Sequence, residues 1–173
     1  DCCLYGLLMY HNFRGSGFVW TAHAPNCWVS DGIIQGDKAW EISNALNQEI
    51  SFDYCDANMV DIIFRRIKKY QKICFLVTKD DLYDVYGKRP YYRWMSITFK
   101  EKSVHEDISN ILARATSIFL AFETQDHPPS LPNGLFKHCI NLGVLVLSSC
   151  AFCFVSPPFL HCHTLRFLGL EHC

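Results

Sequence analysis

The sequence predicts an α+β fold, in which a helical module is followed by a short solenoid of stacked strands. Two observations predict it. Apolar residues recur at helical spacing through much of the first half, and a segment at the end of the chain is a second copy of an earlier one. We therefore expect a first unit over residues 1–86 and a repeat array over 87–173.

Composition limits the classes of function. The 173 residues are half hydrophobic, so the chain is long and apolar enough to bury a core. A formal net charge of -1 gives no overall field that would attract nucleic acid or an anionic membrane. The ten cysteines are irregularly spaced and follow no signal peptide, which predicts reduced, mostly buried thiols and a cytoplasmic location.

The first half predicts four short helices and a strand. Apolar spacing places the helices at about residues 3–8, 24–31, 39–50 and 58–70, and an apolar run predicts the strand at 73–77. Pro25 suits the first turn of the second helix, and Gly32 suits its end. Asp37 is expected to cap the third helix. Short helices closed by a strand are typical of a winged helix.

The third helix is expected to be amphipathic. The residues that share its predicted inward face are Ala39, Ile42, Ala45, Leu46 and Ile50.

The second half contains an internal repeat. The segment FKHCINLGVLVLSSC at 136–150 aligns without gaps with FLHCHTLRFLGLEHC at 159–173, and both contain L-x-x-L-x-L-x-x-C. This is the form of a leucine-rich repeat with Cys at the turn. Weaker copies place Met95, Ile118, Leu145 and Leu168 at equivalent positions, with steps inside the roughly 20–29 residues of such a repeat. Four stacked strands are predicted, with Cys139, Cys150, Cys162 and Cys173 at turn or interior sites.

In such repeats the residues between the leucines face the concave surface. The candidate partner-binding residues on this face are Val144, Val146, Ser148, Arg166, Phe167 and Glu171. Exposed apolar groups there are unfavourable in water, so Val144, Val146 and Phe167 are expected to contact a partner protein or another domain of the same protein.

These features, in this order, resemble the plant nucleotide-binding leucine-rich-repeat immune receptors. Residues 3–8 are similar to the opening of that family's winged-helix subdomain. WVSDGII at 28–34 resembles its Trp-Ile-Ala-Glu-Gly-Phe-Ile segment, and residues 39–46 resemble the helix that follows it. RWMSI at 93–97 resembles the Arg-His-Leu-Ser-Ile entry to the repeats, and residues 116–122 resemble the next strand.

The resemblance implies a fragment of a disease resistance protein that acts in pathogen recognition and defence signalling. It implies protein partners, such as a pathogen effector, a host protein or other receptor domains, and contacts that hold the receptor inactive. Asp1 and Cys173 both look like cut ends, and we expect the chain to be part of something longer.

No cofactor is expected for this chain. The phosphate-binding motif G-x-x-x-x-G-K-[ST] is absent from the sequence, so ADP or ATP is expected only for a full-length receptor. The stretch at 78–82 resembles the family's Met-His-Asp motif, but Asp80 replaces the histidine and would repel a diphosphate.

Other functions have weaker support in the sequence. The basic cluster at 65–72 could bind phosphates on a stand-alone winged helix, and a gene remnant is a further alternative. An uncharged run at 139–160 is interrupted by Asn, Ser and Pro residues, so we predict no membrane span. Cys150-x-x-Cys153 lacks the second half of a zinc finger, and no nucleophile motif is present. We expect no metal site and no enzyme.

Overall fold

The structure is a computed structural model, and it describes residues 1–10, 18–50, 75–79, 92–100, 108–123 and 127–173. The helix predicted at 58–70 and the basic cluster at 65–72 lie outside these residues. So do Asp80, Asp81 and Leu82 of the stretch that resembles a nucleotide sensor.

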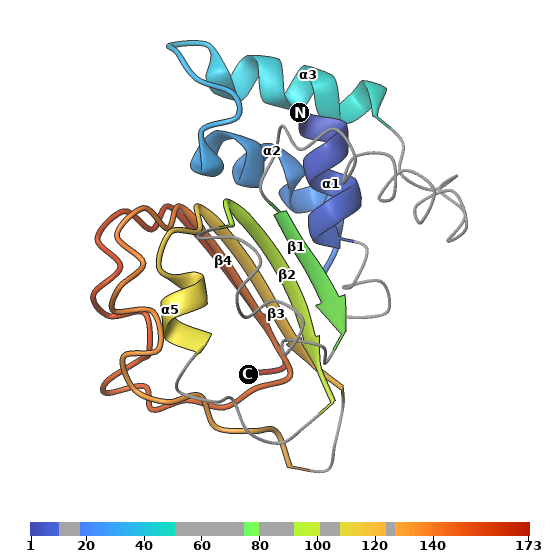
Figure 1. Cartoon of the computed structure of the whole chain (residues 1–173). Helices are drawn as coiled ribbons and strands as arrows, with labels where there is room; N and C mark the ends of the chain where they lie inside the picture. Colours follow the sequence, from blue (N-terminus) through green and yellow to red (C-terminus); the bar gives the residue numbers. More distant parts are fainter. Residues whose placement is uncertain (11–17, 51–74, 80–91, 101–107, 124–126) are drawn as a thin grey trace.

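From residue 75 onward the chain forms a parallel sheet that is wound as a solenoid. Its strands follow one another in chain order: β1 (Phe75–Lys79), β2 (Trp94–Phe99), β3 (Ser117–Phe122), β4 (Val144–Ser148) and β5 (Phe167–Glu171) (Figure 1). Met95 pairs with Ile118, Ile118 with Leu145, and Leu145 with Leu168. The predicted register of the four repeats is therefore confirmed.

A further strand extends the array at its beginning. The strand predicted at 73–77 is β1, and Leu76 pairs with Met95 of β2. The strand that we expected to close a winged helix thus pairs in parallel with the repeat strands. The boundary predicted between residues 86 and 87 falls between two neighbouring strands of one sheet.

The interior of the solenoid is apolar. The second residues of β2, β3 and β4, which are Met95, Ile118 and Leu145, pack with Ile108 and Leu112 of α5 (Ile108–Leu112) on the convex side. Cys139, Cys150 and Cys162 are buried in or beside this core. On β5, the last strand of the described sheet, the equivalent side chains Leu168 and Leu170 are 39% and 42% exposed.

Three helices of the first half lie on the side of the opposite, concave face of the sheet, and two of them contact it. These are α1 (Cys2–Tyr10), α2 (Trp20–Asp31) and α3 (Ala39–Glu49) (Figure 1). Helix α1 contacts β1 and β2, α2 contacts β4 and β5, and α3 packs on α2. We call α1, residues 18–31 and α3 the helical unit. A second apolar core lies between the helical unit and the sheet.

The helices correct three details of the prediction. Helix α2 begins at Trp20, so Pro25 lies inside it and not at its start. Lys38, not Asp37, is the N-cap residue of α3, and it makes no side-chain capping bond. Helix α3 buries Ala39 and Ser43, whereas Ile42 is 47% exposed and Ala45 is exposed, because the helix packs on α2 through a narrow polar seam. The predicted end of α2 at Gly32 is confirmed: Gly32 adopts φ 84°.

Polar contacts between α2 and α3 compensate for the hydrogen bond that Pro25 removes from α2. Proline has no amide hydrogen, so the carbonyl of Thr21, four residues earlier, loses its helical donor. The side-chain amide of Asn47 donates to that carbonyl at 2.8 Å. Ser43 Oγ donates to the carbonyl of Pro25 at 3.0 Å. The irregular turn of α2 therefore becomes the attachment point of α3.

Candidate functional site

The structure covers part of the predicted partner-binding face with the chain's own helices. Val144 and Val146 are buried beneath the helical unit, and Ser148 is also buried. Phe167 is half-buried at the edge of the helical unit, Glu171 is partly exposed and Arg166 is exposed. A partner protein cannot reach Val144 or Val146 in this arrangement, so their contact is with another part of the same chain.

Aromatic side chains fill most of the space between helices and sheet. The ring of Tyr5 from α1 meets the edge of Trp94 on β2, with ring centroids 5.1 Å apart. Phe18 lies 5.7 Å from Phe119 on β3 and 6.5 Å from Phe167 on β5, again edge to face. Such pairs add about 0.5–1.5 kcal/mol each beyond the area that they bury.

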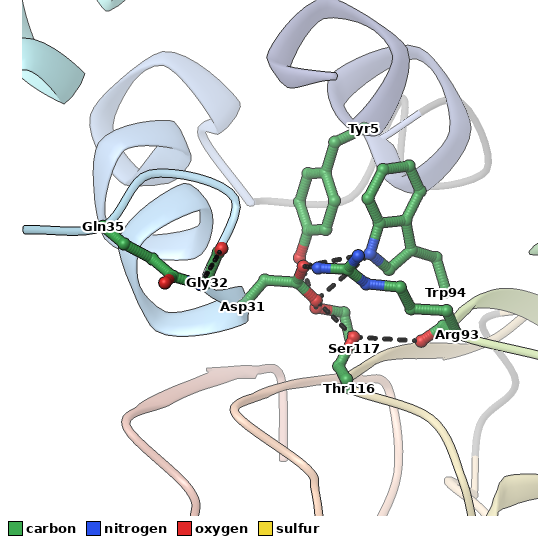
Figure 2. A network of polar contacts seen from close by, with 8 residues as sticks. All are labelled: Tyr5, Asp31, Gly32, Gln35, Arg93, Trp94, Thr116 and Ser117. Atoms are coloured by element: carbon green, nitrogen blue, oxygen red, sulfur yellow. Dashed lines mark hydrogen bonds and ion pairs between the residues drawn. The ribbon is translucent and has the colours of Figure 1, made fainter. Parts of the chain in front are cut away.

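The polar centre of this interface is the carboxylate of Asp31, the last residue of α2 (Figure 2). Its side chain is fully buried. The Arg93 guanidinium donates to Oδ1 at 2.9 Å, and the indole Nε1 of Trp94 donates to the two carboxylate oxygens at 3.0 and 3.1 Å. A buried carboxylate is stable only when charge and hydrogen bonds compensate for lost water, and these two groups supply both.

The next coil of the solenoid supplies two hydroxyl groups to the same carboxylate. Thr116 Oγ1 and Ser117 Oγ donate to Oδ2 at 2.5 and 2.6 Å. The Tyr5 hydroxyl in turn donates to Ser117 Oγ at 2.8 Å. One carboxylate at the end of α2 therefore connects two coils of the repeat array directly and α1 through Ser117. We call these six residues the Asp31 network.

The position of Asp31 in its helix requires such partners. A negative charge at the C-terminal end of a helix is unfavourable because the helix dipole is negative there. Arg93 offsets this charge, and its guanidinium also lies 5.4 Å from the centre of the Trp94 ring. Arg93 remains 45% exposed, so water screens the outer side of the ion pair.

Burial controls the ionisation of Tyr5 beside this network. The phenol is fully buried, and desolvation raises its pKa well above the ordinary value, with Cys27 and Asp31 adding to the rise. Tyr5 therefore stays protonated and acts as a hydrogen-bond donor at neutral pH. Nothing in this arrangement frees a nucleophile or a base, and the network holds surfaces together.

A close backbone contact fixes the same end of α2 on the sheet. A Cβ built on Gly143, just before β4, would lie 2.2 Å from the carbonyl oxygen of Ser30. Only a residue without a side chain allows this approach. Gly143 thus sets how closely α2 can lie against the fourth coil.

The Asp31 network was not predicted from the sequence as a site. Asp31, Arg93 and Thr116 entered the predictions only as parts of family-like segments. One local feature of the sequence does point to Asp31. An Asp immediately before the glycine that ends a helix is disfavoured unless a cation compensates for its charge. Its partners, however, lie 62–86 residues away and are unremarkable on their own.

Other candidate sites give no cluster in the described part of the chain. Among those residues no group of three or more His, Cys, Asp or Glu side chains could hold a metal ion. None of the described helices is long and apolar enough to cross a membrane.

Comparison with known proteins does not place the chain in a family. No family model, no curated protein and no solved structure matches it.

Proposed function

We propose that this chain is part of a plant intracellular immune receptor and forms its regulatory interface, in which a helical unit occupies the concave face of leucine-rich repeats. One observation carries the proposal: the face that repeat proteins use for binding is closed by the chain's own helices through a buried charged network. The sequence resemblance supplies the family.

The physical basis of regulation is competition for one surface. A pathogen product or host protein that binds Val144 and Val146 must first displace the helical unit. The equilibrium between closed and open forms then shifts only as far as the partner's affinities for the two forms differ. The Asp31 network sets the energy that the partner must overcome.

The sequence of the transcript tests whether the chain belongs to this receptor family. An in-frame phosphate-binding loop upstream of the codon for Asp1, with further leucine-rich repeats downstream of Cys173, is the expected result. A start codon directly upstream together with a stop after Cys173 would contradict the proposal.

Variants of the full encoded protein test whether the contact between the helical unit and the repeats is inhibitory. Expressed in leaves, Asp31→Ala is expected to raise defence output, measured as ion leakage, above the wild type. Glu41→Ala is the matched control, because it also removes a carboxylate but from the exposed surface of α3. Equal ion leakage for all three proteins, at equal abundance, would contradict an inhibitory role for the contact.

A further inference from the structure

Two cysteines from successive coils meet at the last turn of the array. Cys150 follows β4 and Cys173 follows β5, and their sulfur atoms lie 3.4 Å apart. Cys150 is buried, whereas Cys173 is exposed. Among the residues that the structure describes, no other two cysteine sulfurs make such a contact.

The backbone brings these residues to the distance that a disulfide requires. Each cysteine stands two residues after the paired positions Ser148 and Glu171, and the residue before each has a left-handed φ, 57° at Ser149 and 53° at His172. Neighbouring strands lie about 4.8 Å apart. Disulfides span Cα separations of about 4.4–6.8 Å. Two equivalent turns in adjacent coils therefore fit the bond with little backbone movement.

The other cysteine pair at equivalent repeat positions is arranged differently. Cys139 and Cys162 have the same separation along the chain as Cys150 and Cys173, but their thiols donate to the carbonyls of Leu112 and Phe136. Both are buried, and desolvation raises their pKa, to about 12 for Cys139. These thiols are inert packing groups, and they provide an internal comparison for the pair at the last turn.

The contact also shifts the pKa values of the two thiols in opposite directions. The hydrogen bond from Cys150, backbone hydrogen bonds and the nearby His172 lower the pKa of Cys173 to about 6. The same hydrogen bond and burial raise the pKa of Cys150. Of the two sulfurs, the more exposed Cys173 therefore ionises more readily than the buried Cys150.

We propose that Cys150 and Cys173 form a redox-active dithiol that hydrogen peroxide converts into a disulfide between the fourth and fifth coils. The Cys173 thiolate attacks one peroxide oxygen, the O–O bond breaks, and Cys173 sulfenic acid and hydroxide form. The Cys150 thiol gives its proton to the hydroxide, and its sulfur attacks the sulfenic sulfur. An S–S bond forms as the S–O bond of the sulfenic acid breaks, and the OH group leaves as hydroxide, which takes up the proton that Cys173 had released to solvent. Two thiol sulfurs are each oxidised by one electron, and the two peroxide oxygens are reduced to water.

The bond would tie together the two coils at the end where Leu168 and Leu170 are uncovered. It fastens β5 to the array whether or not the helical unit regulates anything. The inference therefore stands independently of the proposed function.

Peptide mapping of the full chain tests it. Trypsin cleavage after Arg166 releases residues 167–173, in which Cys173 is the single cysteine. Chymotrypsin cleavage after Leu147 and Phe152 isolates Cys150 in residues 148–152, and cleavage after Leu170 shortens the other peptide to residues 171–173, in which Cys173 is still the single cysteine. After treatment of the folded protein with peroxide and alkylation of free thiols, we expect these two peptides to be joined, and dithiothreitol to separate them.

Three variants test the roles of individual cysteines. Cys150→Ser should leave a sulfenic acid on Cys173 that dimedone traps, because the second sulfur is missing. Cys153→Ser, which removes an exposed thiol near Cys150 in the sequence, and Cys162→Ser should form the disulfide as the wild type does. If Cys150→Ser fails to fold, the peptide map of the wild-type protein still shows whether Cys150 and Cys173 are joined. Cys173 oxidised to sulfinic acid beside an alkylated Cys150, or joined to another cysteine, would overturn the proposal.

Discussion

Gly143 and the carbonyl of Ser30 approach so closely that a Cβ at residue 143 would lie 2.2 Å from the oxygen. This contact joins the start of β4 to the last turn of α2, beside the Asp31 network. The neighbouring atom is backbone and cannot rotate away, so the contact tests directly whether the helical unit is docked on the concave face.

Gly143→Ala is expected to push α2 away from the sheet. Overpacking of this kind costs about 1–3 kcal/mol, and a rigid neighbour places it at the upper end. Tryptophan fluorescence reports it: Trp20, Trp28 and Trp94 are buried at this interface and should shift to longer wavelength, while Trp40 is already half exposed. Gly169→Ala is the control, because its Cβ would meet only side-chain atoms of Phe18 and Val146 at 3.3 Å. Equal effects of the two substitutions would contradict the close docking of α2.

Asp31→Ala should cost more than any single change to its partners. It leaves Trp94 Nε1 and Ser117 Oγ buried without their acceptor, and an unsatisfied buried group costs about 1–3 kcal/mol. We expect a loss of about 3 kcal/mol in the free energy of unfolding, measured by urea denaturation. Arg93→Met should cost less, about 2 kcal/mol. It leaves the buried carboxylate without its cation, but the hydrogen bonds from Trp94 and Ser117 remain, and water reaches the position of the guanidinium, which is 45% exposed. The reverse order would mean that the ion pair, and not the hydrogen bonds, holds the network.

Stability should fall in alkali because of Tyr5. Its pKa is raised in the folded state, so above pH 10 the unfolded chain loses a proton that the folded chain keeps. One such group reduces stability by about 1.4 kcal/mol per pH unit, from pH 10 up to the folded-state pKa. Urea denaturation between pH 9 and 11 measures the slope, and Tyr5→Phe should reduce it. A residual slope is expected from Cys27, whose pKa burial also raises. An unchanged slope in Tyr5→Phe would show that the phenol is not buried as described.

Pro25 and Asn47 should be energetically coupled through the carbonyl of Thr21. Asn47→Ala alone removes the donor to that carbonyl and should cost about 1 kcal/mol. In the Pro25→Ala background the amide at residue 25 can donate to Thr21 instead, so the same change should cost less. A double-mutant cycle measured by thermal unfolding gives the coupling energy. Additive effects would show that Asn47 does not compensate for the proline.

The sequence was most informative where a feature repeats. The constant offset between the two aligned segments identified the register of β4 and β5, because equivalent leucines must share one core. Strand β1 was assigned to a winged helix because it closes a series of predicted short helices. Leu76 precedes Met95 by fewer than the roughly 20–29 residues of a leucine-rich repeat, so the repeat spacing does not indicate its place in the array either. The inward face of α3 was predicted correctly at Ala39, Leu46 and Ile50, which are buried or pack against the second core, but wrongly at Ile42 and Ala45. Apolar periodicity favours Ile42, whereas Ser43 and Asn47 bond to backbone atoms around Pro25.

The interface itself could not be predicted from local patterns. Val144 and Val146 were expected to contact a partner protein or another domain, and nothing local in the sequence indicates that the helical unit lies over them. Asp31 and Arg93 are 62 residues apart in the sequence, and they meet only because α2 packs on the sheet.

The Asp31 network also specifies where along the array the helices can lie. Coils of a solenoid are nearly equivalent, so an apolar helix face could bind one coil as well as the next. The positions equivalent to Trp94 are Ser117, Val144 and Phe167. Shifted by one coil, Asp31 would face Thr116 and Ser117 where Arg93 and Trp94 now lie, and Gly143 and Val144 where the hydroxyls now lie. The carboxylate would lose its cation and its indole together, so a translation of the helices along the repeats is opposed by the burial of an uncompensated charge.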